Sequence, residues 1–119
     1  MAAKPFSASV RHDRAVAIVD LGGEINGAAE VPLQAAYAEA IAPDPRGVLL
    51  NFAAVDYINS TGIALIVGIL AQARRASRRL LACGLSEHYV EIFEITRLAD
   101  FMTVFPDEQS ALAGVPASA

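Results

Sequence analysis

The sequence has one cysteine, one lysine, no tryptophan and no long hydrophobic run. The single cysteine, Cys83, excludes an intramolecular disulfide framework and a cysteine-rich zinc site, and we expect it to be a small buried hydrophobic residue. The longest apolar run, residues 63–71, is about half the length that a membrane-spanning helix needs. Residues 1–6 lack the apolar segment of a secretory signal. We therefore expect a cytoplasmic protein that does not insert into a membrane.

Positive charge is also scarce. Nine Lys and Arg residues face 13 Asp and Glu residues, giving a net charge of −4, and this disfavours a nucleic-acid partner because phosphate contacts need a basic surface. Charged residues make up only 18% and hydrophobic residues 55%, which argues against disorder. Alanine accounts for 24 of the 119 residues and favours helices packed closely on a flat surface.

Apolar spacing and turn residues predict one α/β domain over residues 1–119, with a core at about 6–113 and a loose tail at 114–119. We expect strands at 6–10, 15–21, 48–52, 80–83 and 102–105, and helices at 28–42, 60–76, 87–95 and 107–112. The first two strands would form a hairpin, and the later alternation of strands and helices implies parallel pairing through right-handed crossovers. The expected architecture is a mixed, mostly parallel β-sheet with an N-terminal antiparallel hairpin and about four helices.

Several expectations concern local structure. Residues 11–14 are expected to form a turn, and residues 22–27 and 53–58 are expected to be loops. One face of the first helix would carry Val31, Leu33, Tyr37, Ala40 and Ile41. The first half of the long helix is apolar on every side, so we expect it to be enclosed, with Gly68 marking a close approach to the sheet.

Few residues are arranged for catalysis. His12 and His88 are expected in a turn and on an exposed helix face, and neither accompanies a GxSxG nucleophile. The carboxylates Asp20, Glu24 and Asp56 can gather near strand ends, but their spacing specifies no metal, and solvated or structural carboxylates are the simpler interpretation. We therefore predict no enzyme activity, no metal and no cofactor.

The most informative segment is Asn-Ser-Thr-Gly at residues 59–62, between a buried strand and the long helix. The carboxyl ends of strands are where α/β sheets place their functional crevices. A helix N-terminus there carries about half a positive charge and several unpaired N–H groups. The hydroxyl of Ser60 either caps this helix or accepts a phosphate, and the residues alone leave both readings open.

Two groups of like charge also allow two interpretations each. The basic group at the end of the long helix is Arg74, Arg75, Arg78 and Arg79. It is either a solvated helix end or an anion site. The acidic group on one face of the third helix is Glu87, Glu91 and Glu94. It is either a plain solvent face or a contact for a partner.

Three segments resemble the STAS domain family, and within it the single-domain anti-sigma factor antagonists. Residues 48–52 and 57–65 are similar to the family's apolar strand, Asp-Ser-(Ser/Thr)-Gly and apolar helix. Residues 21–26 are similar to its Leu-x-Gly-Glu-Leu-Asp loop, and residues 92–98 to its Leu-x-Leu-x-Gly-Leu helix end. The resemblance covers residues 7–113. The chain departs from the pattern at Asn59 and Asn26, where the family has Asp, and at Arg97, where it has Gly.

The resemblance implies a regulatory switch. In such proteins the unmodified form binds an anti-sigma factor that is also a serine kinase of the histidine-kinase-like ATPase fold, and this frees a sigma factor. Phosphorylation breaks the complex and a phosphatase restores it. The implied phosphoacceptor here is Ser60, with Thr61 as the alternative. The implied partner-binding residues are Gly23, Glu24, Ile25, Asn26, Tyr57, Asn59, Ser60, Thr61 and Gly62.

Two other functions stay open. A constitutive STAS adaptor, such as a subunit of a bacterial lipid-transport ABC system, is favoured by the absence of both family Asp residues. A small-molecule binder would use residues 22–27 and 59–62 as an anion pocket.

Overall fold

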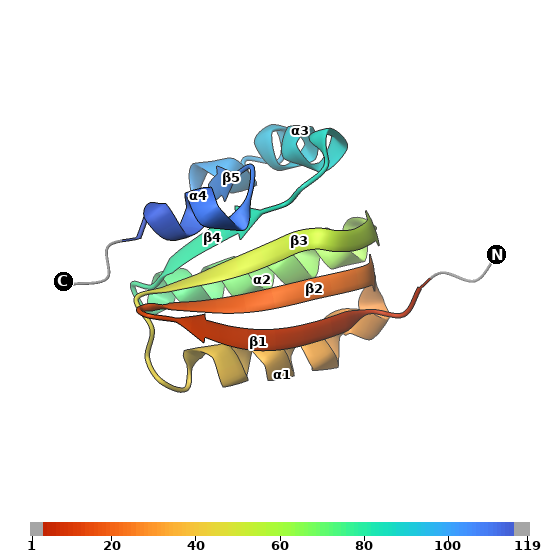
Figure 1. Cartoon of the computed structure of the whole chain (residues 1–119). Coiled ribbons are helices and arrows are strands. Elements are labelled where there is room, and N and C mark those ends of the chain that lie inside the picture. The colour runs from red at the N-terminus through yellow and green to blue at the C-terminus, as the bar shows by residue number, and fades with distance from the viewer. Residues whose placement is uncertain (1–3, 116–119) are drawn as a thin grey trace.

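The computed structural model describes residues 4–115, which form one five-stranded sheet with helices on both faces (Figure 1). In chain order the elements are β1 (Ser7–Asp13), β2 (Val16–Ile25), the 3₁₀ turn η1 (Gly27–Ala29), α1 (Glu30–Ile41), β3 (Gly47–Ile58), α2 (Ser60–Arg75), β4 (Arg79–Cys83), α3 (Glu87–Ile95), the 3₁₀ turn η2 (Leu98–Asp100), β5 (Thr103–Phe105) and α4 (Glu108–Ala113). Within residues 4–115, no helix combines the length and the apolar character needed to cross a membrane.

The sheet has the strand order β1-β2-β3-β4-β5, in which β1 pairs antiparallel with β2 and the other neighbours are parallel. This confirms the predicted mixed sheet with an N-terminal hairpin. The three parallel connections all step in one direction across the sheet. Because such crossovers are right-handed, successive steps in one direction place their helices on the same face.

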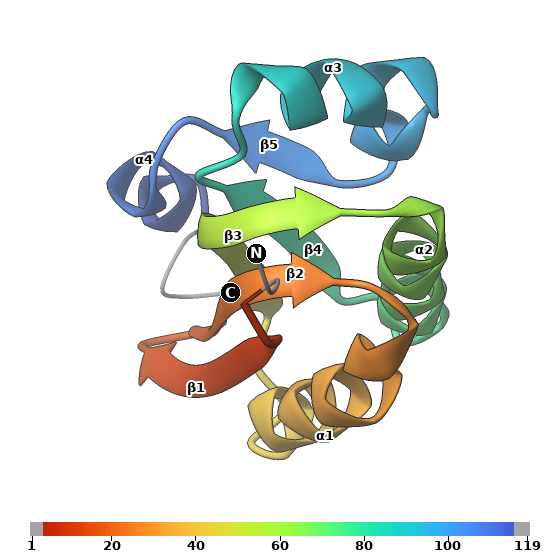
Figure 2. The same ribbon diagram turned by 90° about the vertical axis from the view of Figure 1, so that its right-hand side faces the viewer.

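The two faces of the sheet have separate cores. Side chains alternate along a strand, so Ala17, Val19 and Leu21 face the larger core under α1, α2 and α3. Val16 and Ile18 face the opposite side, where they contact α4 in the smaller core. Viewed along the sheet, α1 and α2 lie on one side and α4 on the other (Figure 2). This double cover explains why the central strands are near-continuous apolar runs.

Strand ends differ most from the sequence expectations. The predicted turn at 11–14 is wrong because β1 extends to Asp13, so His12 lies in a strand. The predicted loops at 22–27 and 53–58 are also wrong over most of their length, because β2 continues to Ile25 and pairs with a β3 that continues to Ile58. The ladder shifts register around Gly23, which has φ +75° and approaches Pro5 so closely that a Cβ would lie 2.1 Å from its carbonyl oxygen. These residues resemble loop breakers in sequence, yet they form a bulged strand end.

The outer faces of α1 and α2 are more exposed than expected. Leu33, Tyr37 and Ala40 are buried as predicted, whereas Val31 is 78% exposed. The first half of α2 is not enclosed, since Val67 on its outer face is 45% exposed. Gly68 does not mark a close approach, because a Cβ there would meet nothing within 4 Å. A helix lying on one face of a sheet has an outer side, and the described residues place no layer over it.

The basic group is dispersed rather than gathered at a helix end. Arg78 pairs with Asp44, and Arg79 belongs to β4 and donates to the Gly114 carbonyl oxygen at 3.0 Å. Only Arg74 and Arg75 remain in the last turn of α2. The predicted cluster of four is therefore wrong, because the chain turns into β4 directly after the helix.

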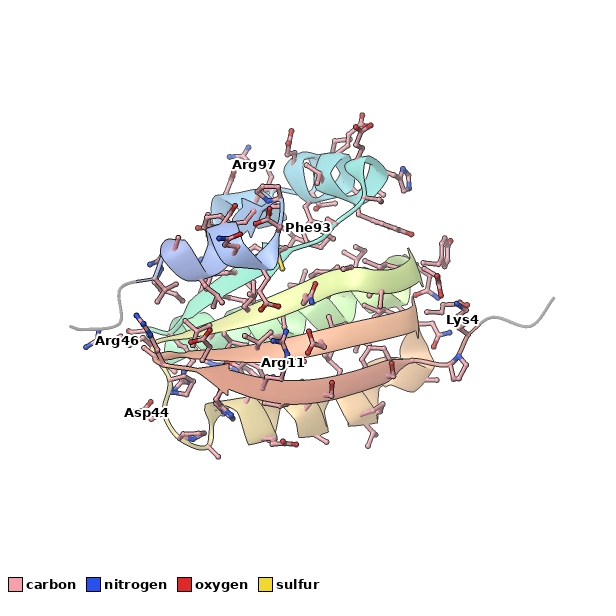
Figure 3. All side chains as sticks on the ribbon, in the orientation of Figure 1. Lys4, Arg11, Asp44, Arg46, Phe93 and Arg97 are labelled. Carbon is pink, nitrogen blue, oxygen red and sulfur yellow. The ribbon has the colours of Figure 1, made fainter. Side chains whose placement is uncertain are left out.

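The C-terminal segment is packed in place as far as it is described. Val115 is buried in the smaller core, which corrects the prediction of a loose tail from residue 114, while residues 116–119 lie outside the described residues. Arg11, on the α4 side of the sheet (Figure 3), bridges Asp20 and Glu108 at 2.6 Å each. The hydrogen bonds from Arg11, with a further one from Asn51, hold the pKa of the Asp20 carboxyl below its usual value despite partial burial.

The expectation for Cys83 is confirmed, and the structure shows what the departure at Arg97 entails. Cys83 is buried at the end of β4, and burial raises its thiol pKa to about 11. Arg97, which points outward after α3 (Figure 3), adopts the left-handed conformation with φ 69° that the family's glycine would accommodate without strain.

Candidate functional site

The site lies where β2 and β3 end and α2 begins. The two strands pair Glu24 with Tyr57 and Ile25 with Ile58, and the next backbone N–H, that of Asn59, donates to the Ile25 carbonyl oxygen at 3.1 Å. The ladder therefore brings together two segments that are more than thirty residues apart in the chain. These two segments carry the motifs that resemble the family pattern in the sequence.

Asn59 caps α2. Its backbone is extended, and its side-chain Oδ1 accepts the Gly62 backbone N–H at 2.8 Å, while its carbonyl oxygen accepts the Ile63 N–H at 2.9 Å. Ser60 is therefore the first residue inside the helix, and the alternative in which its hydroxyl caps the helix is wrong. Within residues 4–115, the exposed hydroxyls of Ser60 and Thr61 make no hydrogen bond, so both are available to another molecule.

Gly62 holds the first turn of α2 against the sheet. A Cβ at this position would lie 2.2 Å from the Ile25 carbonyl oxygen and 2.9 Å from Cγ2 of Ile58. Contacts this short do not occur, so only glycine allows the helix to start at this distance. The position of Ser60 relative to the strand ends is fixed by this contact.

Asn26 performs the same role for η1. Its Oδ1 accepts the Ala28 N–H at 2.9 Å, and its Nδ2 donates to Oε1 of Glu24 at 3.2 Å. An aspartate would keep the first hydrogen bond but would lose the second and set two carboxylates side by side. Asparagine and aspartate cap helices about equally well, so both departures from the family pattern preserve the caps and remove a charge, and at Asn26 the amide also adds the hydrogen bond to Glu24.

Tyr89 of α3 supports the site and was not predicted from the sequence. Its buried hydroxyl accepts the Ile58 N–H at 2.8 Å and donates to the Ile58 carbonyl oxygen at 3.3 Å. The end of β3 is thereby tied to α3 just before Asn59. The available signal was a tyrosine on the inward face of the third helix, because a buried tyrosine hydroxyl usually has a hydrogen-bond partner.

The predicted partner-binding residues fall into three groups by exposure. Gly23, Ile25 and Gly62 are buried and act by positioning their neighbours. Glu24, Asn26 and Asn59 are half-buried. Tyr57, Ser60 and Thr61 are exposed, with Tyr57 at 53%. A protein that approaches this surface therefore meets the aromatic ring, the two hydroxyls and the partly covered polar groups.

The electrostatics of the site favour an anion at Ser60. The free N–H groups of the first turn and the dipole of a 16-residue helix place about half a positive charge there. No carboxylate or imidazole within residues 4–115 is hydrogen-bonded to the Ser60 hydroxyl, so the activating base for any reaction at this oxygen would come from another molecule.

The other candidate groups do not gather here. Asp20 is engaged by Arg11 and Asn51 on the α4 side of the sheet. Among the described residues, no three His, Cys, Asp or Glu side chains lie together in a way that would hold a metal ion. His12 lies on β1, with Nε2 3.4 Å from the Ala40 carbonyl oxygen.

Comparison with known proteins gives consistent matches over this region. The model of the STAS domain matches residues 7–111. A Bordetella bronchiseptica protein provisionally named anti-sigma factor antagonist BtrV is 32% identical over 100 residues, which cover 84% of each chain. The anti-sigma-B factor antagonist of Staphylococcus aureus is 31% identical over 86 residues, covering 72% of this chain and 80% of the relative.

A similar fold is found in the Bacillus cell fate determinant SpoIIAA, solved in its phosphorylated form. It superposes with a TM-score of 0.71 at 20% identity, covering 92% of this chain and all (100%) of that one.

Proposed function

The chain belongs to the STAS domain family, and we propose that it is an anti-sigma factor antagonist switched by phosphorylation of Ser60. In the unphosphorylated state it binds an anti-sigma factor that is also a serine kinase, and the sigma factor is released. A phosphate on Ser60 dissociates this complex, and a phosphatase returns the protein to its binding state.

The observation that supports this proposal most is the placement of Ser60. Its hydroxyl is exposed, is not used as the helix cap and sits at the positive end of α2. A kinase can therefore modify it without disturbing the fold. The resulting phosphate would carry up to two negative charges and accept hydrogen bonds from the free N–H groups of the same turn.

The same phosphate would oppose binding of the partner. An interface that covers Ser60 must remove both the phosphate and the half-buried Glu24 from water and set the phosphate against the surface of the partner. Like-charge contacts and desolvation of this kind cost several kcal/mol in an interface. The switch needs no change of fold.

Ser60 is a better acceptor than Thr61 on geometric grounds. Cγ2 of Thr61 lies 3.7 Å from where a Cβ of Gly27 would be, so the Thr61 side chain faces η1. The Ser60 side chain stands on the outer face of the helix, in line with the exposed Ala64.

Mass spectrometry tests the acceptor. The protein would be incubated with ATP and the serine-kinase anti-sigma factor encoded nearest to it in the same genome. We expect one phosphate on the wild type and on Thr61→Ala, and none on Ser60→Ala. An unmodified wild type, or a phosphate that persists in Ser60→Ala, would contradict the proposal.

Binding of the variants tests the switch. Titration with the same kinase in the presence of ADP should show a complex with the wild type and with Ser60→Ala. Ser60→Asp should bind far more weakly because it places a permanent charge in the interface. Equal affinity of Ser60→Asp and the wild type would argue against the switch.

A constitutive adaptor is the second candidate function. Asn26 and Asn59 favour it, because both preserve the caps without supplying the charge that the family pattern has beside the acceptor. In this case Ser60 would stay unmodified in cells, and the chain would co-purify with a transport ATPase. The anion-pocket alternative is weaker, because residues 22–25 are paired strand rather than a loop that can wrap a ligand.

A further inference from the structure

The outer face of α2 carries an exposed stripe that begins at the candidate phosphoacceptor. Its members recur at the spacing of about 3.6 residues per turn that places side chains on one helix face. These residues, called the α2 stripe below, are Ser60, Ala64, Val67, Ala71 and Arg74, and all are exposed. The middle of the α2 stripe is apolar, and its far end is basic.

The stripe ends in a groove between α2 and Phe101, the residue that follows η2. This α2–Phe101 groove has a volume of about 380 Å³ and is lined by Val67, Leu70, Ala71, Arg74 and Phe101. The guanidinium carbon of Arg74 lies 4.5 Å from the centroid of the Phe101 ring, which is 52% exposed. A large aromatic ring and a guanidinium at the rim of an apolar hollow are the residue types that dominate binding energy in protein interfaces.

The size of a protein interface requires surface beyond the candidate site. A stable interface uses about 20–30 residues on each side, far more than the exposed and half-buried residues around Ser60. From Ser60 to Arg74 the helix rises about 21 Å, which lies within the roughly 30 Å width of an interface of about 800 Å² per partner. The α2–Phe101 groove is therefore close enough to be covered by the same partner.

The composition of the surfaces around Ser60 indicates that the interface extends along the α2 stripe rather than over α3. Interface cores are depleted of charge and enriched in aromatic residues and arginine. The acidic face of α3, with Glu87, Glu91 and Glu94, does not match that composition. The α2 stripe does, and within residues 4–115 Arg74 and Arg75 form no ion pair, so both are available to an acidic group.

We propose that the anti-sigma factor that covers Ser60 also fills the α2–Phe101 groove with an apolar side chain and sets a carboxylate against Arg74 or Arg75. This inference rests on the proposed function. It assigns the partner an apolar projection with an adjacent acidic residue, about 20 Å from the position where it contacts Ser60.

Titration of the unphosphorylated protein with the same anti-sigma factor tests the inference. Phe101→Ala removes the wall of the groove, and Ala71→Arg fills the groove from an exposed helical position without removing a buried group. We expect each to weaken binding by about 30-fold or more, as loss of an interface anchor does. Arg75→Glu should lower the association rate and flatten its dependence on salt.

Ile95→Ala is the matched control, because Ile95 is 71% exposed on α3 and lies outside the stripe. Its affinity should stay within about twofold of the wild type, and circular dichroism should show that all four variants are folded.

The outcomes separate the inference from the proposed function. If the wild type does not bind the anti-sigma factor, the proposed function fails and the inference fails with it. If the wild type binds and both Phe101→Ala and Ala71→Arg bind equally well, the inference is overturned while the proposed function stands. If the two variants alter sedimentation of the isolated protein but not its affinity, the groove holds a second copy of this chain, and the inference is also overturned.

Discussion

Glycine-to-alanine substitution should have opposite effects at two positions of α2. At Gly62 the new Cβ would lie 2.2 Å from the Ile25 carbonyl oxygen, and this backbone atom is held in the β2–β3 ladder. The helix must therefore move outward and strain the hydrogen bond from Asn59 to Ile25. Overpacking of this kind costs up to about 3 kcal/mol, while the better helix propensity of alanine returns about 1 kcal/mol. We expect a net loss of about 2 kcal/mol.

At Gly68 the new Cβ would meet no atom within 4 Å, so only the gain in helix propensity remains. Gly68→Ala should therefore raise the free energy of unfolding by about 1 kcal/mol, which corresponds to a rise in Tm of about 3–6 °C. Equilibrium unfolding in urea, compared at equal m-values, measures both variants against the wild type. If Gly62→Ala is as stable as Gly68→Ala, the first turn of α2 does not lie against β2 as described, and the geometry of the site is wrong.

Three further substitutions test particular contacts. Tyr89→Phe leaves the buried N–H of Ile58 without its partner and should lower the free energy of unfolding by about 1–3 kcal/mol, so an unchanged urea midpoint would refute the role given to this hydroxyl. Arg97→Gly relieves a left-handed backbone and should raise stability by about 1 kcal/mol in thermal melts, whereas a lower Tm would show that its exposed pair with Asp100 matters more. The pKa of Asp20 is lowered on folding, so its contribution is present above the unfolded value of about 4 and is lost as pH falls through the lower folded value. Asp20→Asn should therefore show a flatter loss of stability below pH ~4, and acid unfolding that parallels the wild type would contradict this.

The order of elements was predictable because each strand of the central sheet is a short apolar run bounded by turn residues. Residues 48–52 and 80–83 are examples, and all of them are buried except the half-buried Asn51. The ends of β2 and β3 were not predictable in the same way. Residues 22–25 contain two glycines and a glutamate, and only the partner strand, supplied from another part of the chain, makes them regular.

The exposure of the helices was also mispredicted from the sequence. The cause again lies in contacts between distant parts of the chain. The run at 63–71 is apolar enough for a buried helix, but α2 rests on one face of the sheet and Val67 points away from it. Whether an outer face is covered depends on what else the chain or a partner provides. The apolar outer face of α2, which the sequence predicts to be enclosed, instead forms one side of the α2–Phe101 groove.

The sequence motif located the candidate site, whereas the roles of the individual residues in it follow only from the structure. Capping by Asn59 rather than Ser60 is a displacement of one residue, too small for sequence patterns to resolve. The support from Tyr89 depends on α3 folding back over the end of β3. Capping by Asn59 supports the proposal that Ser60 is the phosphoacceptor, because it leaves the Ser60 hydroxyl without a structural task.

The most direct test of the central claim compares one affinity in two states. The protein phosphorylated on Ser60 and the unmodified protein would each be titrated by calorimetry with the same serine-kinase anti-sigma factor in the presence of ADP. The account predicts that the phosphate weakens binding by about 100-fold or more, equivalent to about 3 kcal/mol. Equal affinities in the two states would contradict it.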